Sequence, residues 1–250
     1  MTSVTTYKRM VQPADVDFSL RATIVSMIGY ILDIAGIDAD SKGFGIKKLT
    51  RENRSWVVSR MALDFYRFPY KYETIHITTW VNDYGKLLTT RNFTMVDENY
   101  NSIFAAVTQW AMIDLFTRRP LDLRHVDEYS QHLCKEKSPI DNPHKIAAII
   151  PQKTAIHKVT YSDIDFNRHV NSLRYITLMV DMLPIEFLSK PNSMHVEINF
   201  LHESRYGDIL TIGYEQSNSK LQFEIKNVRN IAICRASIEW KTDTEWKNLG

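Results

Sequence analysis

The segment VTYSDIDFN, residues 159–167, decides the fold because the chain carries a second version of it, VQPADVDFS, at residues 11–19. Both segments contain an aspartate–hydrophobic–aspartate–phenylalanine core. A stretch with apolar residues at i, i+3 and i+4 spacing follows each one, at residues 23–35 and at residues 172–183. This spacing predicts one amphipathic helix behind each copy of the motif.

Two further pairs of segments recur in the same order along the chain. YETIHITTW at residues 72–80 resembles YGDILTIGY at residues 206–214, and AVTQW at residues 106–110 resembles ASIEW at residues 236–240. Collinear similarity of this kind indicates a duplicated structural unit. The alternative is one large α+β domain in which the similarity is accidental.

The stretches between these landmarks are typical of β-strands. They are rich in β-branched and aromatic residues, and turn sequences such as NDYG and DENYN separate them. Strands are predicted at residues 75–81, 87–95, 104–113, 194–201, 209–214, 221–228 and 231–240. Each half is therefore predicted to be a long helix followed by an antiparallel meander, which buries both apolar faces when the helix packs on one curved sheet.

The predicted fold class is α+β, with two units in tandem. The polar segment KEKSPIDNPHK, residues 135–145, contains two prolines and is a good linker candidate. We therefore expect a first domain at residues 1–140 and a second at residues 141–250.

Composition excludes several classes of protein. The chain has 250 residues, 44% of them hydrophobic, and a formal charge of +2, so it can build a core but has no strong field for nucleic acid or anionic membranes. Two cysteines, Cys134 and Cys234, are too few and too far apart for a disulfide framework or a zinc site. Neither a secretory signal nor an 18-residue apolar run is present, which favours a cytoplasmic protein without a membrane span.

Three groups able to hold or move protons stand directly before the second predicted helix. They are Asp165, Asn167 and His169. An imidazole can take up a proton near neutral pH, an amide both donates and accepts hydrogen bonds, and a carboxylate can orient either one. Each also has a simpler interpretation: an exposed histidine in a first helical turn, an asparagine cap, and a turn-forming aspartate paired with Asp163.

Several segments together resemble the acyl-acyl-carrier-protein thioesterase family, over nearly the whole chain. They are RATIVSMIGYILDIAG with GFGI, WVVSRMALDFYRFPYKYETIHITTWV, WAMIDLFTRRPLDL, YSDIDFNRHVNSLRYI and VEINFLHESRYGDIL. The family has a tandem (double) hotdog fold and releases fatty acids from their carrier. The resemblance implies hydrolysis of fatty acyl-carrier thioesters by direct attack of water, which ends chain elongation and needs no metal or organic cofactor.

The resemblance also implies a catalytic set, which is Asp165, Asn167, His169 and Glu203. Which of the acids or the histidine takes the proton stays open. We expect Glu203 and the tip of the second helix to converge on one cleft, where the bare amides of residues 170–172 would polarise the thioester carbonyl. Plant members often have cysteine after this glutamate, but Ser204 stands here, so a covalent route through that cysteine does not apply.

The first unit keeps an acid but lacks the other catalytic groups. The opposed pairs are Asp17 with Asp165, Ser19 with Asn167, Arg21 with His169, and Pro69 with Glu203. We therefore expect the first unit to be non-catalytic. By family analogy it forms the acyl pocket, with Met27, Ile28 and Ile31 as candidate substrate-binding residues; plain core packing is the alternative.

The implied partner is an acidic acyl carrier protein that bears the fatty acyl thioester. A basic docking surface is then expected, with Arg118, Arg119 and Arg168 as candidates. The competing functions are an acyl-CoA thioesterase and a non-catalytic acyl-binding hotdog protein. Chain length, saturation preference and the choice between monomer and homodimer stay open.

Overall fold

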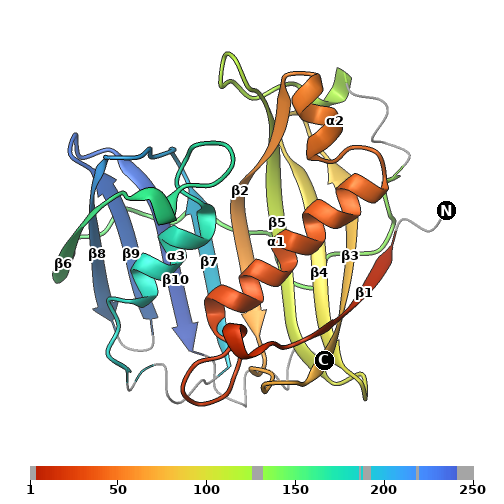
Figure 1. The fold of residues 1–250 in the computed structure, drawn as a ribbon, viewed down its shortest axis with the longest axis horizontal. Coiled ribbons are helices and arrows are strands. Elements are labelled where there is room, and N and C mark those ends of the chain that lie inside the picture. The colour runs from red at the N-terminus through yellow and green to blue at the C-terminus, as the bar shows by residue number, and fades with distance from the viewer. Residues whose placement is uncertain (1–3, 126–131, 186, 188–192, 218–219, 241–250) are drawn as a thin grey trace. The chain divides into compact units, whose positions relative to one another are not determined.

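The computed structural model describes residues 4–125, 132–185, 187, 193–217 and 220–240. The chain divides into two compact units, Met1–Pro143 and His144–Gly250. The expected boundary after residue 140 lies three residues before this division. In each unit a helix lies across one face of an antiparallel sheet (Figure 1).

The described strands of the first unit form a sheet in the order β1-β3-β4-β5-β2, and all neighbours in it are antiparallel. Its strands are β1 (Thr5–Met10), β2 (Arg54–Phe65), β3 (Thr74–Tyr84), β4 (Thr89–Asp97) and β5 (Ser102–Asp114). Its described helices include η1 (Pro13–Asp15), α1 (Ile24–Ser41), α2 (Ile46–Arg51) and η2 (Leu123–His125).

The second unit repeats this topology. Its sheet runs in the order β6-β8-β9-β10-β7, the same succession as in the first unit when each unit's strands are numbered from its own start. The strands are β6 (Lys153–Lys158), β7 (Met194–Phe200), β8 (Ile209–Ser217), β9 (Lys220–Asn227) and β10 (Ala232–Trp240). Among the described residues, its helices include η4 (Tyr161–Asp163) and α3 (Ser172–Val180).

Helix α1 follows from the pattern of its sequence. Thr23 caps it, because the Thr23 Oγ1 accepts a hydrogen bond from the Ser26 N–H at 3.0 Å. Met27, Ile28 and Ile31 recur at helical spacing and are completely buried against the sheet. Their burial makes them part of the core of the first unit.

The same helix is longer than its apolar pattern predicts, since it continues from the expected end at residue 35 to Ser41. Asp38 lies on the buried face of this extra turn and is fully buried. It is tolerated there because Arg91 Nη1 and Lys42 Nζ reach its carboxylate at 2.7 and 2.9 Å. Burial alone would raise the pKa of Asp38, but the two cations hold it below its usual range.

Helix α3 is shorter than predicted. It was expected over residues 172–183 and ends at Val180. Asn171 caps its start, with the Asn171 Oδ1 accepting a hydrogen bond from the Leu173 N–H at 2.9 Å. Pro184 disfavours helical conformation in the residue before it, which accounts for the early end.

A strap formed by residues 144–152 crosses the face of the second sheet that is turned away from α3. Glu197 and Asn199 of β7 alternate with core residues and point to this face. The Glu197 carboxylate lies 2.8 Å from His144 Nδ1, and the Asn199 side chain exchanges hydrogen bonds of 2.9 Å with the backbone of residues 144 and 146. The strap is thus fixed by polar side chains of the sheet.

Candidate active site

The loop of residues 163–171, between η4 and α3, is anchored by Asp163. The buried Asp163 carboxylate accepts hydrogen bonds from Thr160 N at 2.7 Å and Thr160 Oγ1 at 3.1 Å, and it contacts His157 Nε2 and Arg174 Nε, both at 2.9 Å. Burial would raise the pKa of Asp163, but these donors outweigh it and hold the pKa well below the usual range. Asp163 therefore stays charged and joins β6, the loop and α3.

Asp165 organises the turn inside this loop. Its Oδ1 accepts hydrogen bonds from the backbone N–H groups of Asn167 at 2.8 Å and His169 at 3.4 Å. Its own N–H donates to the His169 carbonyl at 2.9 Å, and the Arg168 N–H donates to the Asp165 carbonyl at 3.0 Å. Arg168 adopts a left-handed conformation with φ 62° to close the turn.

The predicted approach of Glu203 to His169 is present. His169 Nε2 lies 3.2 Å from Glu203 Oε2, within ion-pair distance when the imidazole is protonated. The His169 side chain is only 13% exposed, whereas the Glu203 carboxylate is 42% exposed and open to solvent. The Val170 N–H donates to the Ser204 carbonyl at 2.9 Å, which fastens the loop to the segment that carries Glu203.

Asn167 is half-buried and does not cap the helix, so that interpretation of it is wrong. The cap is Asn171, four residues further on. Within the described residues, the Asn167 side-chain amide makes no hydrogen bond to protein. It is therefore available to a substrate or to water.

The amides expected to polarise a carbonyl are mostly occupied, so this expectation is wrong for two of the three residues. The Val170 and Asn171 N–H groups donate to the carbonyls of Ser204 and Asp163, each at 2.9 Å. In the part of the chain that the structure describes, only the Ser172 N–H of the three has no acceptor. It lies at the first position of α3, where the positive end of the helix dipole favours a developing negative charge.

Ser204 is poorly placed to act as a nucleophile. It is 1% exposed, and its N–H donates to the phenol oxygen of Tyr175 at 3.1 Å. Burial raises the pKa of Tyr175, although hydrogen bonding to Ser204 offsets part of this effect. A phenol that keeps its own proton cannot accept the proton of a serine hydroxyl. The surroundings of Ser204 therefore favour a route by direct attack of water.

The first unit contains a loop with the same four defining backbone hydrogen bonds. Its backbone hydrogen bonds run from Asp17 N to Arg21 O at 3.0 Å, from Leu20 N to Asp17 O at 3.0 Å, from Ala22 N to Pro69 O at 2.8 Å, and from Thr23 N to Asp15 O at 3.0 Å. Leu20 has φ 60°, matching the left-handed residue of the second loop. The duplicated motif therefore specifies a loop shape, and the catalytic chemistry is a separate addition to it.

These bonds correct the predicted alignment by one residue. Pro69 and Ser204 supply the carbonyls that receive equivalent bonds, so Pro69 stands opposite Ser204. Phe68, and not Pro69, is the residue opposite Glu203. Phe68 is buried and carries no carboxylate, so the first loop still lacks a partner acid.

The histidine position of the first loop is also without a catalytic group. Arg21 stands there, and its guanidinium donates to the Tyr70 hydroxyl at 2.7 Å while lying 4.7 Å from the centre of that ring. A guanidinium does not release its proton in proteins, so it cannot serve as a base.

The remaining candidates lie in the first unit. A role of Met27, Ile28 and Ile31 in an acyl pocket stays a prediction beside their observed place in the core. Arg118 and Arg119 lie in the turn that follows β5, with Arg118 half-buried and Arg119 exposed. Their role in carrier docking, like that of Arg168 in the second unit, stays a prediction.

The described residues contain no group of three or more histidine, cysteine, aspartate or glutamate side chains that could hold a metal ion. None of their helices combines the length and apolar character required to span a membrane.

A helix laid across an antiparallel sheet, twice along the chain, defines an α+β protein with a double hotdog fold. The structure is similar to that of an acyl-ACP thioesterase from Bacteroides thetaiotaomicron VPI-5482, with 34% identity and a TM-score of 0.87 over 96% of this chain and 98% of the other. The fold is also that of the 12:0-ACP thioesterase from Umbellularia californica, at 16% identity and a TM-score of 0.84 over 96% and 98% of the two chains.

The family follows from the sequence models. Residues 3–132 match the acyl-ACP thioesterase N-terminal domain, and residues 148–242 match the C-terminal domain. The chain belongs to the acyl-ACP thioesterase family.

Curated relatives agree with this assignment. The chloroplastic oleoyl-acyl carrier protein thioesterase of Coriandrum sativum is 23% identical over 231 residues, which cover 81% of this chain and 60% of the relative. A chloroplastic palmitoyl-acyl carrier protein thioesterase of Cuphea hookeriana is 28% identical over 181 residues, or 68% and 43% of the two chains. The chain thus spans about half the length of the curated relatives it matches.

Proposed function

We propose that this chain hydrolyses the thioester that joins a fatty acyl group to acyl carrier protein, releasing the free fatty acid and ending chain elongation. The observation that carries the proposal is the contact of 3.2 Å between His169 and Glu203 beside a loop tip with an unoccupied amide. Family membership supports the class of reaction, and the named substrates of the relatives support a fatty acyl carrier thioester.

The reaction needs a held water molecule and a receiver for its proton. Glu203 presents a solvent-exposed carboxylate to that water, and His169 lies directly behind it. The water oxygen attacks the carbonyl carbon while its proton passes to the His169–Glu203 pair. The tetrahedral intermediate then collapses, the C–S bond breaks, and the proton is returned to the leaving thiolate.

The developing oxyanion needs donors aimed at it. In the described part of the loop and helix tip, the Ser172 N–H and the Asn167 side-chain amide make no hydrogen bond to protein and can supply them. Asp165 has a positioning role in this scheme, because its carboxylate holds the Asn167 and His169 backbone. The first unit is non-catalytic and contributes to the acyl pocket.

The runner-up is an acyl-CoA thioesterase, which uses the same chemistry on another carrier of the thiol. Docking of an acidic carrier on Arg118, Arg119 and Arg168 predicts that the preference for carrier substrate weakens as salt rises. Activity on matched acyl-carrier and acyl-CoA substrates at low and high salt separates the two. The choice between monomer and homodimer stays open, and the cytoplasmic location predicted from the sequence stays a prediction.

The test is release of the carrier thiol from carrier protein acylated with a series of chain lengths. We expect His169→Ala, Asn167→Ala and Glu203→Gln to lower kcat by about a hundredfold or more without unfolding the protein, as for loss of a general base or an oxyanion donor. Arg21→Ala, at the position of His169 in the first loop, is the matched control and should leave kcat unchanged.

Two outcomes would count against the proposal. Full activity in all three variants would remove the site assignment. A wild-type protein that binds the acylated carrier but releases no thiol at any chain length would show a non-catalytic acyl-binding protein.

A further inference from the structure

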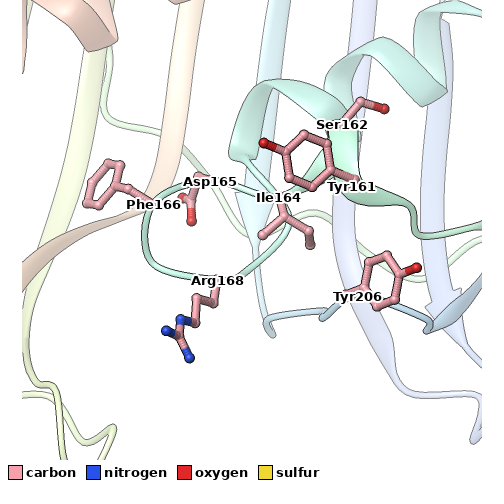
Figure 2. A pocket seen from close by; sticks show the side chains of 7 residues that line it. All are labelled: Tyr161, Ser162, Ile164, Asp165, Phe166, Arg168 and Tyr206. Atoms are coloured by element: carbon pink, nitrogen blue, oxygen red, sulfur yellow. The ribbon is translucent and has the colours of Figure 1, made fainter.

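A pocket of about 680 Å³ opens on the outer side of the second loop (Figure 2). Its lining includes Tyr161, Ile164, Asp165, Arg168 and Tyr206. Asp165 holds the backbone of His169, and Tyr206 follows Glu203 by three residues, so the pocket adjoins the proposed catalytic groups.

The two tyrosines of the pocket are unusually open to solvent. Tyr161 is 88% exposed and Tyr206 is 72% exposed. In Figure 2 they lie above and below Ile164 on one side of the loop, and the Arg168 side chain extends from the lower edge of the same loop. Exposed aromatic rings grouped around one pocket are typical of a binding surface.

The duplicated loop shows that the fold does not need these side chains. The hydrogen bonds that align the two loops put Pro13 opposite Tyr161, Leu20 opposite Arg168, and Lys71 opposite Tyr206. The four backbone hydrogen bonds that define the loop and its left-handed residue are the same in both units, although all three side chains differ, and the first loop has a further bond from the Lys71 N–H to the Leu20 carbonyl at 2.9 Å. Their presence only in the loop with the His169–Glu203 pair points to contact with a ligand.

We propose that this pocket binds the pantetheine arm through which the acyl group is joined to the carrier protein, an inference that rests on the proposed function. The arm has two amides, a gem-dimethyl group and a terminal phosphodiester. The tyrosine rings and Ile164 offer apolar surface to the gem-dimethyl group and to the amide planes, and the phenol hydroxyls offer hydrogen bonds. The positively charged guanidinium of Arg168 can pair with the negatively charged phosphodiester.

The acyl chain fits this pocket less well than the arm does. An acyl chain carries neither charge nor hydrogen-bonding groups, and it is bound best in an enclosed apolar cavity. This pocket is open, carries polar groups at its rim, and includes the guanidinium of Arg168. The arm leaves the thioester in the direction away from the acyl chain, so a site beside the catalytic loop suits it.

The test uses full-length protein and substrates that share one acyl group but differ in the thiol. The substrates are the thioesters of N-acetylcysteamine, pantetheine, 4′-phosphopantetheine and the carrier protein, with acyl-CoA as a further arm. Arg168→Leu and Tyr206→Lys introduce the residues that the first loop carries at these positions, and Tyr161→Ala removes the other ring. Tyr100→Ala is the control, since Tyr100 is an 83% exposed tyrosine in the β4–β5 turn of the first unit.

We expect Tyr161→Ala and Tyr206→Lys to raise KM about five- to tenfold for the pantetheine and carrier substrates, with kcat and the KM for the N-acetylcysteamine substrate unchanged. Arg168→Leu should raise KM for the phosphopantetheine substrate but not for the pantetheine substrate. An equal loss on the N-acetylcysteamine substrate would overturn the proposal, because the residues would then support the loop or the acyl group. An unchanged KM for the pantetheine substrate in both tyrosine variants would also overturn it.

Binding of free 4′-phosphopantetheine, followed by NMR, separates this proposal from the proposed function. Binding that weakens in the three variants but not in Tyr100→Ala supports the pocket even if the wild type hydrolyses nothing. Hydrolysis by the wild type together with unchanged binding in the variants leaves the function standing and removes the pocket. In the two tyrosine variants, unchanged KM values for acyl-CoA with raised values for the carrier substrate would place the carrier protein, rather than its arm, on the tyrosines and overturn the proposal.

Discussion

Replacing Glu197 by Gln should destabilise the protein at neutral pH and remove part of its dependence on pH. Glu197 belongs to β7 and holds the strap, with His144 Nδ1 at 2.8 Å and His195 Nε2 at 3.6 Å from its Oε1. Its side chain is only 11% exposed. Burial would raise the pKa of Glu197, but His195 and His144 outweigh it and lower the pKa to about 2.

The magnitude follows from the two pKa values. The separation between an ordinary pKa of 4.5 and a folded-state pKa of about 2 corresponds to about 3 kcal/mol of stability. Because the folded pKa is depressed, this stability is fully present above the unfolded-state pKa and is lost as the pH falls through the folded-state pKa. More than half of it should be gone at about pH 3.

The assay is urea denaturation of wild type and Glu197→Gln from about pH 7 down to about pH 3, followed by fluorescence and circular dichroism. We expect the difference in unfolding free energy to be largest near neutral pH and to shrink below about pH 5. Glu239→Gln, on the neighbouring strand β10 and exposed, is the control and should show no such difference. A difference that stays constant with pH, or none at neutral pH, would refute the reasoning.

Three further predictions concern stability and reactivity. Gly213→Ala should lower the unfolding free energy by about 1–3 kcal/mol in a denaturant titration, because a Cβ there would lie 2.7 Å from Pro151 Cβ. An unchanged denaturation midpoint would show that the strap moves aside at no cost in stability. Burial raises the pKa of the Cys234 thiol. A thiol reagent at neutral pH should therefore label the half-buried Cys134 first and Cys234 only on unfolding. Equal labelling rates for the two cysteines in folded protein would contradict this. Asp163→Asn should lower the unfolding free energy by about 2 kcal/mol and reduce kcat, because it removes the charge that anchors the loop. Full activity together with full stability would show that this anchor is dispensable.

The architecture could be predicted because both copies of the motif keep the same loop-forming residues before an apolar helix. The sequence alignment of the two units is nevertheless wrong by one residue in this region, because it matches two tyrosines and so places Tyr72 opposite Tyr206. In the structure Tyr72 and Gly207 are equivalent, and both have positive φ, 69° and 87°. A glycine and a tyrosine in the same left-handed position share no sequence signal.

Features that depend on distant partners were missed. Helix α1 extends past its apolar pattern because buried Asp38 meets Arg91, which lies 53 residues away in the chain. The strand β6 is almost wholly exposed and therefore lacks the alternating pattern that marks a half-buried strand. Glu203 has no local signal either, and only the resemblance to a family identified it before its contact with His169 could be observed.

The central claim is that His169 and Glu203 act as one catalytic unit in the second loop. A double-mutant cycle of His169→Ala, Glu203→Gln and the combined variant, measured by single-turnover hydrolysis of the acylated carrier, tests it most directly. We predict that each single change slows the chemical step by about a hundredfold or more and that the combined variant is hardly slower than the worse single one. Losses that multiply in the combined variant, or wild-type rates in Glu203→Gln, would contradict the account.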